Sequence, residues 1–278
     1  MASASIVGST GLVGSHILST LLSHPSISSV HSLSRRDPKP STTSPKLHPL
    51  TSTDTATWSS LLSSISPSPL LFFSALGTTK AQAGSIEAQR KIDYDLNLEL
   101  ASTFSQAETT TENKENKENN KIYILISTHG ANPSSMIPYS KMKGELEDAV
   151  QALLEKKENR VKHVIILRPG LIVGEREDSR PAEFVARKVA GWMGWVNPGL
   201  QDFWAQDARV IGRAAVEAGV RAMRGGDGEM GEIPRVWELG QRDIVRLGKT
   251  EWKGGMGSCD GECVMERGVR GLGCDLFE

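Results

Sequence analysis

Short apolar runs alternate with polar, turn-rich stretches along most of the chain. Six runs have the length and the branched or aromatic side chains typical of buried strands: Ile6–Val7, Ser29–Leu33, Leu47–Leu50, Leu70–Leu76, Ile122–Ser127 and Val164–Arg168. Stretches with a helical spacing of apolar positions fall between them. Strands that alternate with helices predict an α/β fold, a doubly wound parallel sheet with helices on both faces.

A glycine turn follows the first strand at once. Glycines stand at positions 8, 11 and 14, and a helical pattern begins within the turn. They let the backbone turn tightly and approach a pyrophosphate, while the helix N-terminus offers unpaired N–H groups. The spacing differs from the commoner Gly-x-Gly-x-x-Gly, but its place between a strand and a helix predicts a Rossmann, NAD(P)-binding domain. The expected cofactor contacts are Gly8, Ser9, Thr10, Gly11, Leu12, Val13 and Gly14.

Arg35 and Arg36 stand just past the second strand, where an NAD site would place an acidic residue for the ribose hydroxyl. Guanidinium groups suit a 2′-phosphate, so this pair favours NADP(H) over NAD(H). The alternative is that both arginines are solvated loop residues, because residues 37–40 begin a turn-rich stretch. Gly77 and Thr78, at the end of the fourth strand, are further candidate contacts to the cofactor.

Ser127, Tyr139 and Lys143 are the candidate catalytic residues. Ser127 ends an apolar run, and Tyr139 opens a helical pattern in which Lys143, four residues later, shares its face. A nearby ammonium favours the phenolate, so we expect a lowered pKa for Tyr139, which would let it act as general acid or base. Ser127 would hold a substrate carbonyl or alcohol. Alone, a Tyr-x-x-x-Lys pair is more often an exposed pair on a helix, and the glycine turn is what favours chemistry here.

Composition fits one domain over residues 1–252. With 278 residues, 38% hydrophobic residues and a net charge of −1, the chain can bury a large core, and a nucleic-acid partner is not expected. Residues 106–120 are of low complexity and predict a mobile loop. Residues 253–278 hold all three cysteines among many glycines; disorder is favoured over a metal site, because the spacing is not Cys-x-x-Cys and no histidine is near. No metal is expected.

Trp192, Trp195, Phe203 and Trp204 form a local concentration of aromatic residues. They fit an apolar substrate pocket, a membrane interface or ordinary core packing. No stretch approaches the roughly 18 apolar residues of a membrane-spanning helix. The first 36 residues resemble a mitochondrial transit peptide in lacking acidic residues. Because its removal would delete the glycine turn, we interpret this segment as folded protein.

Several motifs together resemble the atypical short-chain dehydrogenases: the glycine turn, Leu76–Lys80, the Ser127, Tyr139, Lys143 set, and Leu167–Gly170. Glu175–Pro181 with Ala186–Lys188 resembles the Tat-interacting oxidoreductase-like proteins, and most closely their fungal branch at the mitochondrial outer membrane. The resemblance covers about residues 4–252. It is weak in the 106–120 segment and absent from the cysteine-containing tail.

The resemblance implies an NADP(H)-dependent oxidoreductase that acts on an unknown carbonyl or alcohol. Lys143 would also hold the nicotinamide ribose, with Pro169 and Gly170 beside the nicotinamide, while Tyr139 moves the proton and Ser127 orients the oxygen. It also implies a peripheral place on the cytosolic face of the outer membrane, with the cytoplasm as the alternative.

The chain departs from the family pattern at one position, and an alternative function stays open. Such domains often carry an Asp after the third strand for the adenine, but Leu50-Thr51 stands there, and Asp54 is expected to cap the next helix. The alternative function is a non-catalytic NADPH-binding redox sensor or interaction protein. A protein partner and peripheral membrane contact are left open, as are the substrate, the reaction direction and the oligomeric state.

Overall fold

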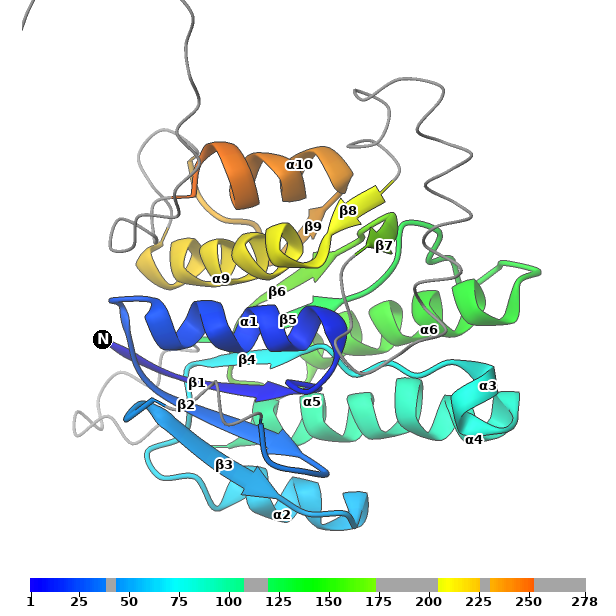
Figure 1. Cartoon of the computed structure of the whole chain (residues 1–278), viewed down its shortest axis with the longest axis horizontal. Coiled ribbons are helices and arrows are strands. Elements are labelled where there is room, and N and C mark those ends of the chain that lie inside the picture. Colours follow the sequence, from blue (N-terminus) through cyan, green and yellow to red (C-terminus); the bar gives the residue numbers. More distant parts are fainter. Residues whose placement is uncertain (39–43, 108–119, 174–204, 226–230, 253–278) are drawn as a thin grey trace, which may run out of the picture.

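A seven-stranded parallel sheet forms the centre of the molecule (Figure 1). The computed structural model describes residues 1–38, 44–107, 120–173, 205–225 and 231–252. The strands are, in spatial order, β3 (Leu47–Thr51), β2 (Ile27–Ser34), β1 (Ala2–Val7), β4 (Leu71–Ser74), β5 (Lys121–Ile126), β6 (Val161–Leu167) and β9 (Val236–Leu239). A separate parallel pair joins β7 (Leu171–Val173) to β8 (Ala205–Asp207). The six predicted strands are confirmed, whereas β7, β8 and β9 were not predicted.

Helices cover both faces of the sheet, which confirms the doubly wound fold (Figure 1). One face carries α1 (Leu12–Ser23), α9 (Ala208–Arg224), α10 (Gln241–Val245) and the π-helical turn η5 (Arg246–Thr250). The other carries α2 (Trp58–Ser63), α5 (Asn97–Gln106), α6 (Pro138–Ala152) and the 3-10 turn η4 (Leu153–Glu155). Between β4 and α5 lie α3 (Lys80–Ala83), α4 (Ile86–Arg90) and the π-helical turn η3 (Lys91–Leu96).

The central strands are largely apolar because both of their faces are covered. All six residues of β5 are buried. Ile122, Ile124 and Ile126 pack on the α1 and α9 side, and Tyr123 and Leu125 pack on the α5 and α6 side. Alternate side chains of one strand therefore contribute to two separate hydrophobic cores, one on each face of the sheet.

Helix α9 is enclosed by other elements on more than one side. Thirteen of its 17 residues are buried. A Cβ on Gly212 would lie 3.0 Å from His16 of α1, and a Cβ on Gly248 of η5 would lie 2.2 Å from the Val210 carbonyl oxygen. Small residues at these contacts allow the backbones to approach closely and close this side of the core.

Several local expectations can now be compared with the structure. Asp54 does cap the turn η2 (Thr55–Thr57) that leads into α2, since its carboxylate accepts a hydrogen bond from Ala56 N at 3.0 Å. Gln106, the first residue of the expected mobile loop, is the last residue of α5, and the mobility of the loop stays a prediction. Residues 108–119, the four clustered aromatic residues and the 253–278 tail lie outside the described residues. Within the described part, no helix is long and apolar enough to cross a membrane.

Candidate functional site

The glycine turn lies where β1 meets the end of β4. Gly8 has φ +82°, a backbone conformation that favours glycine, and a Cβ on it would lie 2.5 Å from the Ala75 carbonyl oxygen. A Cβ on Gly14 would lie 2.0 Å from the Gly8 carbonyl oxygen. Side chains are thus excluded at both positions, and the start of α1 is held against the carboxyl edge of the sheet, on the right in Figure 1.

The N-terminus of α1 can receive an anion. Gly11 is its N-cap, no side chain in the described part of the chain caps the helix, and its first turn has no acidic residue. The first N–H groups and the positive end of the helix dipole are therefore available to a pyrophosphate. Ser9 is buried and its hydroxyl lies 2.7 Å from that of Ser32, which ties the turn to β2.

Arg35 and Arg36 follow β2 directly and both are exposed. The Ser34 hydroxyl donates to the Arg36 carbonyl oxygen at 2.7 Å, which shapes the backbone at this point. β2 pairs with β1, and Ser32 of β2 contacts the glycine turn. Both arginines follow β2 and therefore lie at the same edge of the sheet as the turn. Their role toward a 2′-phosphate stays a prediction.

Ser127 and Lys143 meet at the end of β5. Ser127 is buried, and its hydroxyl has no hydrogen-bond partner among the described residues. Lys143 is 2% exposed and its Nζ donates to the carbonyl oxygen of Ile126, the residue before Ser127, at 3.2 Å. A buried hydroxyl without a partner is costly, so Ser127 is well placed to bind a ligand oxygen.

Tyr139 lies in the first turn of α6, four residues before Lys143. The expectation of a lowered phenol pKa is wrong. Desolvation raises the pKa of Tyr139, and the Asp93 carboxylate raises it further. Burial lowers the pKa of Lys143, while Asp93 and Glu147 oppose that effect. Tyr139 is therefore protonated at neutral pH, which suits it to donate a proton.

Comparison with known proteins gives the family. A family model described as HIM1 matches residues 52–190. Protein fmp52-1, mitochondrial, of Aspergillus terreus is 47% identical over 254 residues, covering 90% of this chain and 100% of the relative. Protein fmp-52, mitochondrial, of Neurospora crassa is 45% identical over 257 residues, covering 90% and 97%. The chain belongs to the Fmp52 family. The fungal resemblance expected from the sequence is thereby confirmed.

Solved structures show that the chain shares its fold with short-chain dehydrogenases. A short-chain dehydrogenase from Burkholderia cenocepacia in complex with NADP matches with a TM-score of 0.55 and 19% identity, covering 88% of this chain and 91% of that one. A UDP-glucuronic acid 4-epimerase from Bacillus cereus in complex with NAD matches with a TM-score of 0.54 and 14% identity, covering 85% and 76%.

The loops after β4 and β6 complete the edge of the Fmp52 sheet around Ser127. Ser127 N donates to the Leu167 carbonyl oxygen and His129 N to that of Pro169, both at 2.8 Å. Pro169 and Gly170 therefore lie beside the loop that carries Ser127. On the other side, the contact of Gly8 with Ala75 brings the β4 loop, with Gly77 and Thr78, next to the glycine turn.

Sequence reasoning missed two buried carboxylates near Lys143. Asp93 of η3 is fully buried and accepts from Thr78 N at 2.7 Å. Glu147 is 2% exposed and receives the Arg168 guanidinium, whose Nη1 also bonds Glu238 at 2.7 Å. The spacing of Lys143 and Glu147, four residues apart on a helix, could have indicated the second. No local signal indicated the first, because Asp93 lies far from Lys143 in the sequence.

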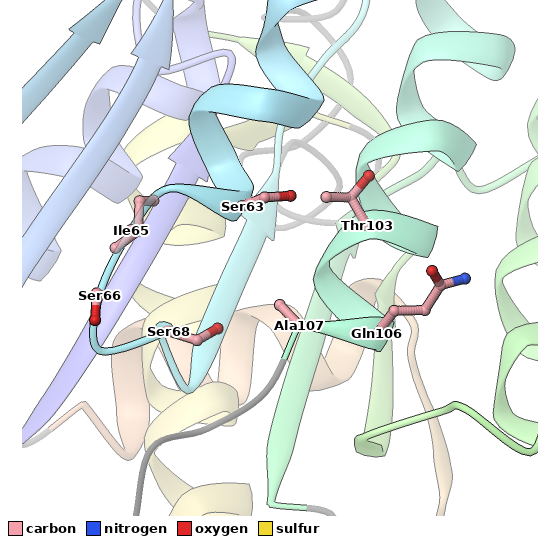
Figure 2. Close-up of a pocket in the computed structure, with 7 residues that line it drawn as sticks. All are labelled: Ser63, Ile65, Ser66, Ser68, Thr103, Gln106 and Ala107. Atoms are coloured by element: carbon pink, nitrogen blue, oxygen red, sulfur yellow. The ribbon is translucent and has the colours of Figure 1, made fainter.

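A separate pocket of ≈ 500 Å³ opens at the amino edge of the sheet (Figure 2). It is lined by Ser63, Ile65, Ser66, Ser68, Thr103, Gln106 and Ala107. None of the predicted site residues lies there. Over the described part of the chain, no three His, Cys, Asp or Glu side chains gather in a way that could hold a metal ion.

Proposed function

We propose that this Fmp52-family protein is an NADP(H)-dependent oxidoreductase of short-chain dehydrogenase type that acts on a carbonyl or alcohol substrate. The observation that carries the proposal is the buried, unpartnered Ser127 hydroxyl beside the buried Lys143, with Tyr139 one turn away on α6. Such a group of a hydroxyl, an ammonium and a phenol can bind an oxygen and deliver a proton to it. The fold supports the proposal, since the structural neighbours include NADP and NAD complexes.

The residues present fit a dinucleotide. At Gly8 and Gly14 a Cβ would overlap a neighbouring backbone carbonyl oxygen, so glycine keeps the turn tight at the start of α1, which begins without an acidic cap among the described residues. The glycine turn would hold the pyrophosphate, Gly77 and Thr78 the adjoining ribose, and Lys143, Pro169 and Gly170 the nicotinamide end. When bound, NADPH supplies a hydride for carbonyl reduction.

NADP(H) is favoured over NAD(H) by Arg35 and Arg36. Both are exposed at the carboxyl end of β2, on the edge where the ribose of the adenosine half would lie. A guanidinium gains a charge-assisted hydrogen bond from a 2′-phosphate, but not from a bare hydroxyl.

Tyr139 would donate the proton and Ser127 would orient the substrate oxygen. Tyr139 is 40% exposed, but partial desolvation of its phenol and the Asp93 carboxylate raise its pKa, so the phenol holds its proton at neutral pH. A protonated phenol suits carbonyl reduction, where the developing alkoxide takes that proton. Ser127, with its hydroxyl free of other hydrogen bonds within the described chain, can bond the same oxygen.

A mitochondrial location belongs to the proposal, at the cytosolic face of the outer membrane. The names of the relatives support the organelle. The membrane face rests on the sequence resemblance. Met136 and Ile137, 96% and 63% exposed in the loop between β5 and α6, favour contact with an apolar surface. The same exposure favours the second candidate function, a non-catalytic NADPH-binding protein that docks a partner or the membrane.

Tyr139→Phe separates the two candidates. We expect it to lower NADPH oxidation with a panel of aldehydes and ketones by about 10²- to 10⁴-fold, the usual contribution of a general acid, and to leave NADPH binding by calorimetry intact. Tyr94→Phe is the matched control, because the Tyr94 ring packs under the Arg90 guanidinium, 4.2 Å from its centroid. Tight NADPH binding without turnover on any carbonyl would instead favour the sensor, and no binding of either dinucleotide would refute the proposed function.

A further inference from the structure

We infer that Asp93 is a positioning residue that holds the Lys143 ammonium and the loop after β4 in one arrangement for the cofactor. The inference rests on the proposed function for its last step, and on the described contacts for the rest. Among the described residues the Asp93 carboxylate makes no hydrogen bond to Ser127 or to the glycine turn, so its part is to act through Lys143 and Thr78.

The place of Asp93 in the fold is unusual. Asp93 is fully buried in η3, a π-helical turn inserted between α4 and α5. Burying a carboxylate is costly unless hydrogen bonds and opposite charge compensate, and π-helical turns occur frequently at functional sites. The burial of Asp93 therefore needs compensating partners, and the structure provides them on two sides.

The first side is the loop after β4. Asp93 Oδ1 accepts from Thr78 N at 2.7 Å, and its other oxygen accepts from Gln89 Nε2 at 3.4 Å. The same Gln89 amide donates to the Thr78 carbonyl oxygen at 2.8 Å. Both polar groups of the Thr78 backbone are thus engaged, and this fixes the loop that would contact the cofactor.

The second side is Lys143. The charged groups that face Lys143 are Asp93 from η3 and Glu147 from α6. Glu147 is already engaged by Arg168, whose Nε lies 3.2 and 3.1 Å from its two oxygens. The groups that donate to the Asp93 carboxylate in the described part of the chain, Thr78 N and Gln89 Nε2, are neutral, so its negative charge is left to balance Lys143.

Asp93 acts on Lys143 through space, since the Lys143 Nζ donates to the Ile126 carbonyl oxygen. Burial lowers the pKa of Lys143, and the Asp93 carboxylate is the first of the two groups that oppose it. The same carboxylate raises the pKa of Tyr139. Burial raises the pKa of Asp93 itself, and Lys143, the Thr78 N–H and Gln89 oppose that effect. While Asp93 is ionised, its charge favours a charged lysine and a neutral tyrosine.

Asp93→Asn tests the inference, because an amide oxygen can still accept from Thr78 N but carries no charge. NMR titration of the lysine side-chain Cε signals, with Lys143 assigned through Lys143→Met, should show Lys143 losing its proton at lower pH in the variant. Asp95→Asn is the matched control, since Asp95 is exposed two residues later. NADPH binding to Asp93→Asn should be roughly tenfold weaker at neutral pH and weaken further as the pH rises.

An unchanged titration of Lys143 in Asp93→Asn would overturn the inference. The titration needs no cofactor, so it stands even if NADPH does not bind to the wild-type protein, an outcome that would refute only the proposed function. Should Asp93→Asn fail to fold, Asp93→Glu keeps the charge at an altered position. The inference then predicts that folding is restored and that Lys143 titrates near its wild-type pH; loss of folding in this variant too would assign Asp93 to packing alone.

Discussion

Two buried lysines lie at opposite ends of strand β5 and differ in their surroundings. Lys121 begins the strand, is fully buried, and donates to the Ser68 hydroxyl at 2.8 Å and the Phe104 carbonyl oxygen at 2.9 Å. Lys143 reaches the other end of the strand and faces Asp93 and Glu147. Burial is common to both side chains, but only Lys143 is balanced by carboxylates.

The difference in neighbouring carboxylates predicts a structural role for Lys121 and a functional role for Lys143. Lys121 has neutral acceptors and a cationic neighbour, Arg160, so burial and that charge lower its pKa from 10.5 to about 8. Its bond to Phe104 satisfies a carbonyl near the end of α5, as basic side chains do at helix C-termini. Lys143 lies beside the Ser127 hydroxyl instead, which has no hydrogen-bond partner among the described residues. We therefore expect the amino edge of the sheet to serve stability and the carboxyl edge to serve binding.

Removing each lysine is the strongest test of this comparison. Lys143→Met should reduce NADPH turnover by at least about 10²-fold, because the ammonium at the nicotinamide end is lost. Lys121→Met should leave kcat and KM within about twofold and change only thermal stability. Steady-state kinetics with thermal melts of both variants give the answer. Equal losses of activity would remove the distinction between the two edges.

A side chain in the glycine turn should weaken NADPH binding strongly. In Gly14→Ala the new Cβ would overlap the Gly8 carbonyl oxygen, 2.0 Å away, so the turn must shift from the pyrophosphate. We expect about 10²-fold weaker NADPH binding by calorimetry and a loss of about 1–3 kcal/mol in the free energy of unfolding. Gly130→Ala, whose Cβ would lie 3.5 Å from the Ser140 hydroxyl, is the control and should bind normally.

A smaller and more selective effect is expected at the arginines. The double variant Arg35→Ala, Arg36→Ala should weaken NADPH binding by about 10- to 10²-fold, since charge-assisted hydrogen bonds to the 2′-phosphate are lost. NADH binding should hardly change. Calorimetric titration with both dinucleotides measures the ratio, and an equal loss for both would refute the assignment to the 2′-phosphate.

The sequence was sufficient for six strands of the sheet and for the position of its carboxyl edge, because short apolar runs and glycine turns are local signals. β9 was missed, since it is only four residues long and partly exposed. The lowered pKa expected for Tyr139 failed for a different reason. The helical spacing of Tyr139 and Lys143 is local, whereas burial and the Asp93 charge arise only when η3 packs beside α6.

The smallest expected effect is the pH dependence of stability at Lys121. Its folded pKa of about 8 lies below its ordinary 10.5, so between these values the unfolded chain binds more protons than the folded one. Stability contributed by this group therefore rises with pH from about 8 to 10.5.

The comparison of wild type with Lys121→Met isolates that contribution. The free energy of unfolding of the wild type, relative to the variant, should increase across this pH range and stay constant below about pH 7. Urea unfolding at several pH values measures it, with Lys91→Met as the control because Lys91 is exposed. A flat difference would mean that Lys121 keeps its charge in the folded protein. The lack of a neighbouring carboxylate would then not distinguish Lys121 from Lys143.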